Sequence, residues 1–342
     1  MRASVIIRSK DEAARLRLTL ASLGRQTEPA EVVVVNDGST DDTEAVISEA
    51  AQHMQIVGVR HAEPRGRSGA ANAGAERASG DILLFLDGDT LAAPDLVARH
   101  LAVHRAAPGV VARGDTRHLR CTRFFADPET GSPRPGEEAR VERLSQAELG
   151  RMRVTRADVL GDFQSIDARS QPGIYPGAGP RLIYELEMDA LRHHPDCSVL
   201  WAAAAGANQS VPAEAFRKAG GFDVDLTINE HRELALRLCR AGHRMVPAED
   251  ARSYHLTHRV GWRDPLLDAD WERRFYARHP LPEVALLRVL WGSLADPCPL
   301  PPSAQIRSLP ELSRAAAACA GLTGLEAVCE AHIAATAPAM AS

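Results

Sequence analysis

The chain has 342 residues, of which 45% are hydrophobic and 25% charged, and its formal net charge is −5. This length permits one large domain or two ordinary ones with a sizeable core, and the lack of a basic excess argues against a general nucleic-acid-binding protein. The six cysteines are scattered without a Cys-x-x-Cys pair, which argues against a zinc site or a disulfide framework and favours a reduced, cytoplasmic setting.

The first 115 residues alternate strand patterns with helix patterns. Short apolar runs predict strands, covered on both faces, over residues 3–8, 31–36, 55–60 and 81–87. The segments between and after them predict helices over residues 11–25, 41–54, 69–79 and 92–106. This alternation predicts an α/β fold with a mainly parallel, Rossmann-like sheet flanked by helices. Ligands of such sheets bind beyond the carboxyl ends of the strands.

The pattern is less regular after residue 115. Residues 116–180 have loop composition, apart from a possible helix over 140–153 and a Gly/Pro-rich segment, 169–181, that predicts a mobile loop. A further helix is predicted over residues 229–243. The last tract, residues 266–342, is predicted to be helical and either to pack on the rest of the chain or to form an oligomer contact.

The fourth strand pattern runs directly into two carboxylates, Asp87 and Asp89. Two negative charges so close repel each other, and both lose solvation, unless a cation lies between them. In extended backbone residues i and i+2 face the same side, and Gly88 leaves room for a ligand to approach. The pair therefore predicts a site for a divalent metal ion, although a helix N-cap in a solvated turn would use the same residue type.

Four blocks of the sequence resemble, in order and in spacing, those of the family 2 glycosyltransferases of the GT-A fold. The resemblance covers residues 3 to about 258, and its blocks are SVIIRSKDEAARLRLTLASL, VVVVNDGSTDDT, GRSGAANAGAERASGDILLFLDGDT, and FRKAGGFD followed by NEHRELALRLCRAG. It implies transfer of a sugar from a nucleotide-diphospho-sugar, with a UDP-sugar as the expected donor, to an acceptor hydroxyl or other nucleophile. It also implies inversion at the sugar and a Mn²⁺ or Mg²⁺ cofactor.

The resemblance assigns residues to the metal ion and to the base of the donor nucleotide. Asp87 and Asp89 correspond to the D-x-D element, in which the second carboxylate binds metal and the first also turns toward the donor sugar. His255 is expected to complete the metal site, in preference to His258; a solvated loop histidine is the alternative. Asp37 is expected to contact the donor base, and otherwise to cap the following helix.

Two basic segments are further donor-binding candidates. At the Gly-rich start of the third helix, the resemblance implies donor binding by Asn72 and by a nearby basic residue. Arg67 is preferred to Arg65 for that basic residue, and the alternative for either arginine is an exposed charge without a ligand. Arg8 and Lys10 depart from the family, which has a proline or threonine and then a tyrosine at these positions. They would favour phosphate or an acidic donor sugar, or else pair with nearby carboxylates, and the residues alone do not decide between these roles.

The catalytic base is where the chain departs most from its relatives. In the family's E-D-x-E-L helix the aspartate is the general base of inverting members, but this chain has Glu230 followed by His231. Histidine titrates near neutral pH and can act as a base, so both residues are candidates, and packing at the helix start is the alternative for His231. On the acceptor side, Asn208 and Asp223 are expected contacts.

These assignments divide the chain into a nucleotide-sugar-binding half (1–115), an acceptor-binding and catalytic half (116–265) and a helical extension (266–342). The expected acceptor is a small molecule, a peptide or a glycan. No nucleic-acid partner and no membrane span are expected, and the C-terminal helices are the candidate contact of a homo-oligomer. Two other functions stay open. A sugar-phosphate nucleotidyltransferase would require a G-x-G-T-R-type loop that the first strand lacks, and a non-catalytic carbohydrate-binding scaffold would explain the missing aspartate.

Overall fold

The computed structural model describes residues 1–172, 182–258 and 270–336, so most of the Gly/Pro-rich segment and the two ends of the 266–342 tract lie outside the described residues. The strands are β1 (Ala3–Ser9), β2 (Glu31–Asp37), β3 (Ile56–His61), β4 (Ile82–Asp87), β5 (Thr90–Ala92), β6 (Val111–His118), β7 (Phe125–Asp127), β8 (Ser132–Pro133), β9 (Gln209–Pro212) and β10 (Met245–His255). The helices of the first half are α1 (Ala13–Leu23), α2 (Thr43–Ala50), α3 (Gly66–Arg77), α4 (Leu96–Ala106), α5 (Glu138–Glu142), α6 (Gln146–Met152), α7 (Arg156–Gly161) and α8 (Phe163–Arg169). Those of the second half are α9 (Ile183–His193), α10 (Ala213–Lys218), α11 (Glu230–Arg240), α12 (Asp270–Arg278), α13 (Pro282–Ala285), α14 (Leu287–Ser293), α15 (Leu309–Ala318) and α16 (Leu325–Thr336).

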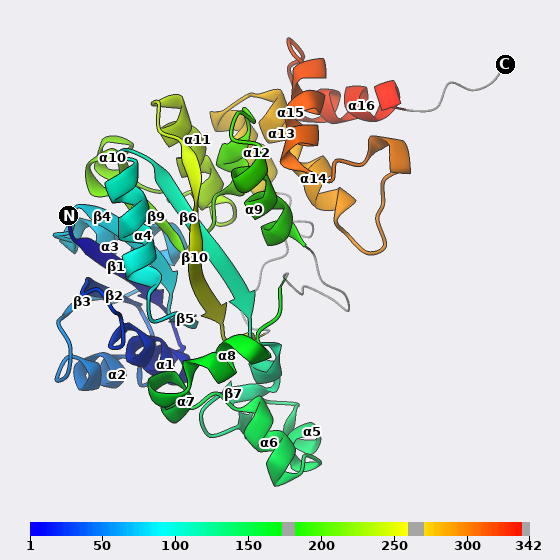
Figure 1. Ribbon diagram of the computed structural model, residues 1–342. Helices are drawn as coiled ribbons and strands as arrows, with labels where there is room; N and C mark the ends of the chain where they lie inside the picture. The colour runs from blue at the N-terminus through cyan, green and yellow to red at the C-terminus, as the bar shows by residue number, and fades with distance from the viewer. Residues whose placement is uncertain (173–181, 259–269, 337–342) are drawn as a thin grey trace.

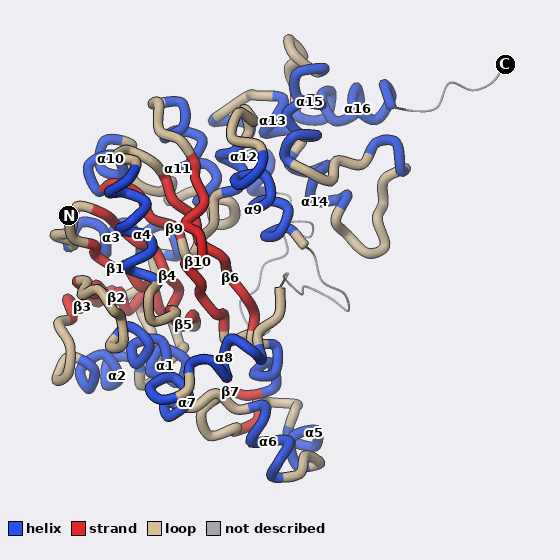
Figure 2. The backbone as a smooth tube through the Cα atoms, in the orientation of Figure 1, coloured by secondary structure: helices blue, strands red, loops and turns tan. Residues whose placement is uncertain are grey.

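One eight-stranded sheet organises the molecule, with the strand order β3-β2-β1-β4-β9-β6-β10-β5 (Figures 1 and 2). Strands β1 to β4 pair in parallel, as the alternating sequence pattern predicts. The sheet as a whole is mixed, because β9 runs antiparallel to both β4 and β6, and β5 runs antiparallel to β10. The predicted α/β fold class is thus confirmed, whereas the antiparallel strands were not expected.

Helices cover both faces of this sheet because its strands are apolar on both sides. Along β1, Val5 and Ile7 face a cluster that includes side chains of α1, α2 and α4, whereas Ile6 faces a second cluster with α3. Burying each such side chain contributes about 1.5–3 kcal/mol. Helix α3 approaches β1 closely at Gly74, where an added Cβ would lie only 2.5 Å from the Ile6 side chain.

The C-terminal helices extend the second cluster. Side chains of α12, α13, α15 and α16 pack in the same buried group as α9 and α11, among them Phe275, Val284, Leu309 and Val328. The described part of the 266–342 tract is therefore helical and packs on the rest of the chain, which is one of its two predicted roles. In Figure 1 these helices lie at the opposite end of the molecule from α5 and α6.

The helix predicted over 140–153 is two short helices, α5 and α6. The break occurs because Ser145 begins α6 as its N-cap: its hydroxyl accepts a hydrogen bond from the Glu148 N–H, and the Glu148 carboxylate accepts one from the Ser145 N–H at 2.8 Å. Such a capping box fixes a helix start and ends the preceding turn.

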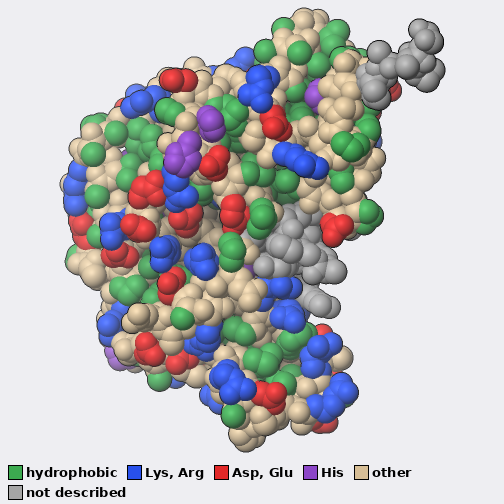
Figure 3. All heavy atoms as spheres, turned by 45° about the vertical axis from the view of Figure 1, so that its right-hand side comes forward, with side chains coloured by type: hydrophobic (Ala, Val, Ile, Leu, Met, Phe, Trp, Pro, Cys, Tyr) green, Lys and Arg blue, Asp and Glu red, His purple; other side chains and the backbone are tan. Residues whose placement is uncertain are grey.

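Charges of both signs are interspersed on the face shown in Figure 3, in keeping with the small net charge. Among the residues that the structure describes, none of the helices combines the length and the apolar character that crossing a bilayer requires.

Candidate active site at the carboxyl edge of the sheet

Asp89, His255 and His258 converge just beyond the ends of β4 and β10. Asp89 Oδ2 lies 3.1 Å from His255 Nε2 and 2.7 Å from His258 Nε2. The three side chains come together because the final residue of β10, His255, pairs with Thr90 of β5, directly after Asp89. Their three ligating atoms all lie within 4.8 Å of one another, an arrangement that can hold a metal ion.

The charges of this cluster are coupled. Burial would raise the pKa of Asp89, but His255 and His258 outweigh it and hold that pKa well below its ordinary value. Burial would likewise lower the pKa of His255, and Asp89 outweighs it and raises that pKa. Thr90 Oγ1 donates to the second oxygen of Asp89 at 3.1 Å. Asp89 is therefore an ionised carboxylate with two imidazole rings directed at one of its oxygens.

Two further residues support the histidines. His118 Nδ1 lies 3.2 Å from His255 Nδ1, and burial lowers the pKa of His118 to about 3, so its ring is neutral. Arg15 of α1 donates to the carbonyl of Leu256 at 3.2 Å and to that of Phe125 at 2.8 Å, which fixes the segment that carries both histidines. The geometry of the cluster is thus set by α1, β6 and β10 together.

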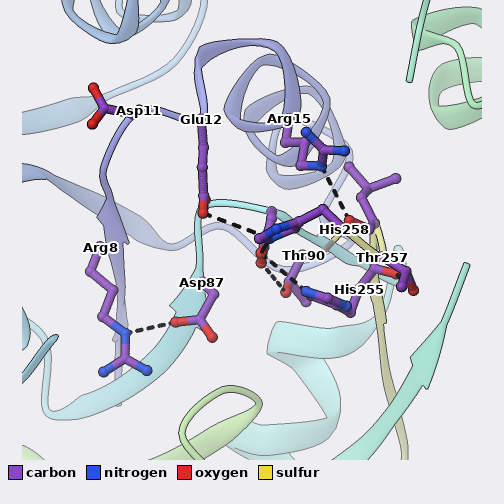
Figure 4. A network of polar contacts seen from close by, with 12 residues as sticks. Arg8, Asp11, Glu12, Arg15, Asp87, Thr90, His255, Thr257 and His258 are labelled. Carbon is purple, nitrogen blue, oxygen red and sulfur yellow. Dashed lines mark hydrogen bonds and ion pairs between the residues drawn. The ribbon is translucent and has the colours of Figure 1, made fainter. Parts of the chain in front are cut away.

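Glu12 lies between this cluster and the rest of the site. It reaches from the start of α1 toward His258, with 3.8 Å between Glu12 Oε1 and His258 Nε2 (Figure 4). Burial, and then the neighbouring Asp89 and Asp87, raise the pKa of Glu12 well above its ordinary value. An additional cation among these carboxylates would relieve their mutual repulsion.

The chemistry of this donor set fits a divalent ion. It combines one carboxylate oxygen with two imidazole nitrogens, and imidazole binds transition metals readily, whereas Mg²⁺ prefers oxygen ligands and retained water. The cluster therefore suits Mn²⁺ better than Mg²⁺.

Asp87, which was expected to share the metal, pairs with Arg8 and lies apart from the two histidines (Figure 4). Arg8 and Asp87 are opposite each other in the register of β1 and β4, and Arg8 Nε donates to Asp87 Oδ1 at 2.7 Å. The same guanidinium donates to Glu230 Oε1 at 3.3 Å and to the Gly206 carbonyl at 3.3 Å. Burial opposes its charge, but Asp87 and Glu230 outweigh burial and raise the pKa of Arg8. Arg8 thus links the strand end of β4 to the start of α11.

Asp37 is engaged by the protein itself. Asp37 Oδ1 lies 2.7 Å from His61 Nδ1 and accepts the Arg65 N–H at 2.8 Å, while Oδ2 accepts the Gly66 N–H at 2.9 Å. Asp37 therefore caps α3, and not the helix directly after it, as its alternative role would have required. Its contact with a donor base stays a prediction. Nearby, Lys10 is exposed and pairs with Asp11.

The two candidates on α3 differ in their surroundings. Arg67 is exposed, and its positive charge makes a small contribution to the lowered pKa of Glu230 and slightly offsets the rise in the pKa of Glu12. Asn72 uses both ends of its amide on Phe222: Nδ2 donates to the Phe222 carbonyl, and Oδ1 accepts the Phe222 N–H, both at 2.8 Å. This geometry supports a structural role for Asn72, and its expected donor contact stays a prediction.

The expected acceptor residues also differ. Asn208 is fully buried, and its Nδ2 donates to the Asp115 and Ala251 carbonyls at 2.9 and 2.8 Å, so the structure supports a role in the sheet and not contact with an acceptor. Asp223 lines an open pocket of about 370 Å³ together with Arg278, with which it forms an ion pair.

Glu230 and His231 stand at the first turn of α11. Burial would raise the pKa of Glu230, but His231 and Arg8 outweigh it and lower that pKa. His231 Nδ1 lies 3.7 Å from Glu230 Oε2, and burial lowers the pKa of His231. The structure thus brings both base candidates next to Arg8, and through Arg8 next to Asp87.

Comparison with known proteins decides the family. The sequence profile described as "Glycosyl transferase family 2" matches residues 4–159. Validoxylamine A glucosyltransferase of Streptomyces hygroscopicus subsp. jinggangensis is 32% identical over 294 residues, which cover 82% of this chain and 62% of that protein. The chain belongs to glycosyl transferase family 2. It spans less than two thirds of the length of this curated relative.

Solved structures agree with the GT-A fold of this family. A mannosyltransferase, PcManGT, from Pyrobaculum calidifontis in complex with GDP-Man and Mn²⁺ aligns with a TM-score of 0.51 and 20% identity, covering 98% of this chain and 80% of that one. Residues 1–349 of TarS from S. aureus in complex with UDP-GlcNAc align with a TM-score of 0.50 and 15% identity, covering 86% of this chain and 70% of that one.

Several residues of the candidate site were not found from the sequence. The resemblance favours His255 over His258 as the metal ligand, whereas the structure brings both to Asp89. Glu12 follows a predicted strand at its carboxyl end, which is the signal that could have found it. His118 and Arg15 gave no such signal, because their roles depend on contacts with residues more than a hundred positions away.

Proposed function

We propose that the protein transfers a glycosyl group from a nucleotide-diphospho-sugar to a nucleophilic group of an acceptor. The observation that supports this most directly is the convergence of Asp89, His255 and His258 at the carboxyl edge of the sheet in a family 2 chain. Asp89 and the two histidines would hold a divalent ion, with Mn²⁺ preferred over Mg²⁺ because of the nitrogen ligands. Bound there, the ion would supply Lewis-acid neutralisation of the departing diphosphate.

The donor would lie along the ends of β1, β2 and β4. Asp37 would meet the base, and Asp87, paired with Arg8, would bind the sugar. Arg67 and Lys10 would add positive charge near the phosphates. The named relative is a glucosyltransferase, and structural neighbours were solved with UDP-GlcNAc and with GDP-Man. UDP-glucose is therefore the first donor to test, followed by UDP-GlcNAc and GDP-mannose.

The reaction would be a single displacement with inversion. The acceptor oxygen forms a bond to the anomeric carbon, the bond from that carbon to the phosphate oxygen breaks, and the nucleoside diphosphate leaves with the electron pair. The acceptor proton goes to a base at the start of α11, for which Glu230 and His231 are the candidates. The name of the relative makes a small polar molecule the first acceptor class to test, with Asp223 as a candidate contact.

The test is a panel of nucleotide sugars assayed for transfer and for donor hydrolysis, with Mn²⁺, with Mg²⁺ and with EDTA. We expect turnover of at least one donor, a higher rate with Mn²⁺ than with Mg²⁺, and loss of turnover in EDTA. NMR of the product should show the anomeric configuration inverted. Full activity in EDTA would contradict the metal assignment, and a product of retained configuration would contradict single displacement.

A further inference from the structure

A buried charged cluster lies behind the base candidates. It consists of Arg113 of β6, Glu187 of α9 and Arg232 of α11, whose residues are 0%, 1% and 4% exposed. Glu187 accepts hydrogen bonds from both arginines, one on each carboxylate oxygen. The Arg113 guanidinium lies 5.1 Å from the ring centre of Tyr184, and that of Arg232 lies 5.4 Å from Trp291.

Stability alone does not account for this cluster. Two cations share one carboxylate, so the cluster buries an excess positive charge. In addition, Nε and Nη2 of Arg113 are buried without a hydrogen-bond partner among the described residues. Buried ion pairs are often no more stable than apolar side chains of similar volume, and unpaired buried donors are unfavourable. The cluster is therefore better explained by the side chain that it holds in place.

The cluster fixes the protonation of His231. Arg232 Nη1 lies 2.9 Å from His231 Nε2, and because a guanidinium can only donate, Nε2 must supply its lone pair. The ring proton is then on Nδ1. Arg232 is itself held by the Ala202 carbonyl at 2.8 Å and by Asn229 Oδ1 at 2.5 Å. A neutral imidazole has one lone pair, so in this arrangement His231 has none left to accept a proton from a substrate.

Glu230 is differently placed. The Nδ1 side of His231 faces its Oε2 at 3.7 Å, and Arg8 Nη1 donates to its Oε1 at 3.3 Å. Within the described chain, the hydrogen bond from Arg8 is the one that the Glu230 carboxylate accepts, although Glu230 is only 2% exposed. A buried carboxylate with so few donors retains lone pairs for a proton. The acceptor proton becomes strongly acidic as its oxygen bonds to carbon, so even a weakly basic carboxylate can take it.

We propose that Arg232, held by Glu187 and Arg113, fixes His231 as an N–H donor beside Glu230, and that Glu230 accepts the proton of the acceptor. His231, Arg232 and Glu187 are then positioning residues, and the base occupies the first position of the family's E-D pair instead of the second. This proposal rests on the proposed glycosyl transfer. In that step the acceptor O–H proton passes to the Glu230 carboxylate while the new C–O bond forms and the nucleoside diphosphate leaves.

Two variants separate the roles of Glu230 and His231. Glu230→Gln should lower kcat by about 10²- to 10⁴-fold, the usual contribution of a general base. His231→Asn places an amide N–H close to where Nδ1–H stands but removes the ring as a base, and it should lower kcat by less than about tenfold. Both should leave the donor KM unchanged. A His231→Asn enzyme as inactive as Glu230→Gln, or an active Glu230→Gln enzyme, would overturn the assignment.

The positioning chain is tested on Arg232. The charged groups around His231 are Glu230 and Arg232 of α11, Arg8 of β1 and Glu187 of α9. Arg232→Met frees Nε2, so kcat should fall about tenfold and gain a dependence on pH below the ordinary pKa of histidine, because burial still lowers the pKa of His231 in this variant. Arg232→Lys, which can still donate to Nε2, should restore most of the rate.

Arg240→Met is the matched control, because Arg240 is an exposed arginine at the last position of the same helix, whereas His231 lies in its first turn. It should change neither kcat nor its pH profile. Glu187→Gln should behave as a weaker form of Arg232→Met. If Arg232→Met loses kcat without a new pH dependence, or if Arg240→Met acquires one, the positioning role is wrong. Thermal unfolding of each variant verifies that it is folded, and the two variants at residues 230 and 231 test the proposal independently of Arg232.

The tautomer can be read without any assay of activity. In ¹⁵N-histidine NMR the signal of His231, identified by its loss in His231→Asn, should show Nδ1 protonated and Nε2 bare at pH 7. The opposite tautomer in the wild type would overturn the proposal whatever the activity. A wild type with the expected tautomer but no transfer or hydrolysis of any donor would instead refute the proposed function, while supporting control of the ring by Arg232.

Discussion

Two pairs of histidines on this chain have nearly opposite chemistry. His255 and His258 lie at the carboxyl edge of the sheet and contact Asp89. His100 and His104 lie between α4 and β9, fully buried, and both rings contact the hydroxyl of Ser210 at 2.8 Å. One pair therefore faces a negative charge, and the other faces neutral hydrogen-bond partners.

This difference decides which pair suits a cation. Asp89 raises the pKa of His255, whereas burial lowers the pKa of His100 and of His104 to about 4. Spacing by itself would have pointed to the wrong pair, because His-x-x-x-His on one helix, as in His100 and His104, is a common metal-ligand pattern. The presence of a carboxylate at the end of a strand is the better indicator of the site.

The largest effect should come from the carboxylate that distinguishes the pairs. Asp89→Asn should lower metal-dependent turnover by about 10³-fold, since the ion contributes several kcal/mol to the transition state. Steady-state rates over a range of Mn²⁺ concentrations measure this. Asp81→Asn is the control, because Asp81 is an exposed carboxylate just before β4, at the opposite end of the strand. Equal losses in both variants would mean that charge in general matters, and not the Asp89 cluster.

The buried pair should govern stability at acid pH. The unfolded rings titrate near 6.5, while the folded rings of His100 and His104 have a pKa of about 4. Between these values the unfolded state binds more protons, so the free energy of unfolding should fall as pH drops from about 6.5 to 4, by up to roughly 1.4 kcal/mol per pH unit for each ring. Denaturant unfolding at a series of pH values measures this slope. His104→Gln should flatten it, and a slope unchanged in that variant would show that other groups cause the loss.

His258 offers a finer test of the edge cluster. His258→Ala should weaken Mn²⁺ activation about 10- to 100-fold, because Asp89 and His255 remain. His53→Ala removes an exposed histidine and should have no effect. A normal Mn²⁺ dependence in His258→Ala would leave Asp89 and His255, two of the three ligands that the sequence resemblance implies, as the residues that hold the ion.

Asp37 should show the smallest effect, divided between binding and folding. Asp37→Ala removes the cap of α3 and the partner of His61, which should lower the free energy of unfolding by about 1 kcal/mol. It should also weaken nucleotide binding about tenfold if the carboxylate meets the donor base. Calorimetry with UDP and with GDP, beside thermal unfolding, separates the two effects. Lower stability with unchanged nucleotide affinity would leave Asp37 as a helix cap alone.

The regular part of the fold could be predicted because its signals are local. Strands β1 to β4 and helices α1 to α4 follow from apolar runs and helix patterns, and their ends lie within a few residues of the predicted ones. The antiparallel strands β5 and β9 have only three and four residues, too few for a pattern, and their direction depends on long-range pairing. The break between α5 and α6 required the capping box at Ser145 to be recognised.

Part of the candidate site could also be predicted, because some of its residues have local signals in the sequence. Asp89 lies just after β4 and His255 ends β10, both match family motifs, and the structure brings them together. The pairing of Asp87 with Arg8 follows from a strand register that the sequence does not display, across 79 positions. The cluster of Arg113, Glu187 and Arg232 joins three elements, and neither its burial nor its contact with His231 has a local signature.

Mn²⁺ binding tests the central claim most directly. Wild type, Asp89→Asn and Asp81→Asn are titrated with Mn²⁺ and the free ion is followed by EPR, in the absence of any substrate. The account predicts one Mn²⁺ per chain in the wild type and in Asp81→Asn, and affinity at least about 100-fold weaker in Asp89→Asn. Equal Mn²⁺ affinity in the wild type and Asp89→Asn would show that the ion does not bind between Asp89 and the two histidines.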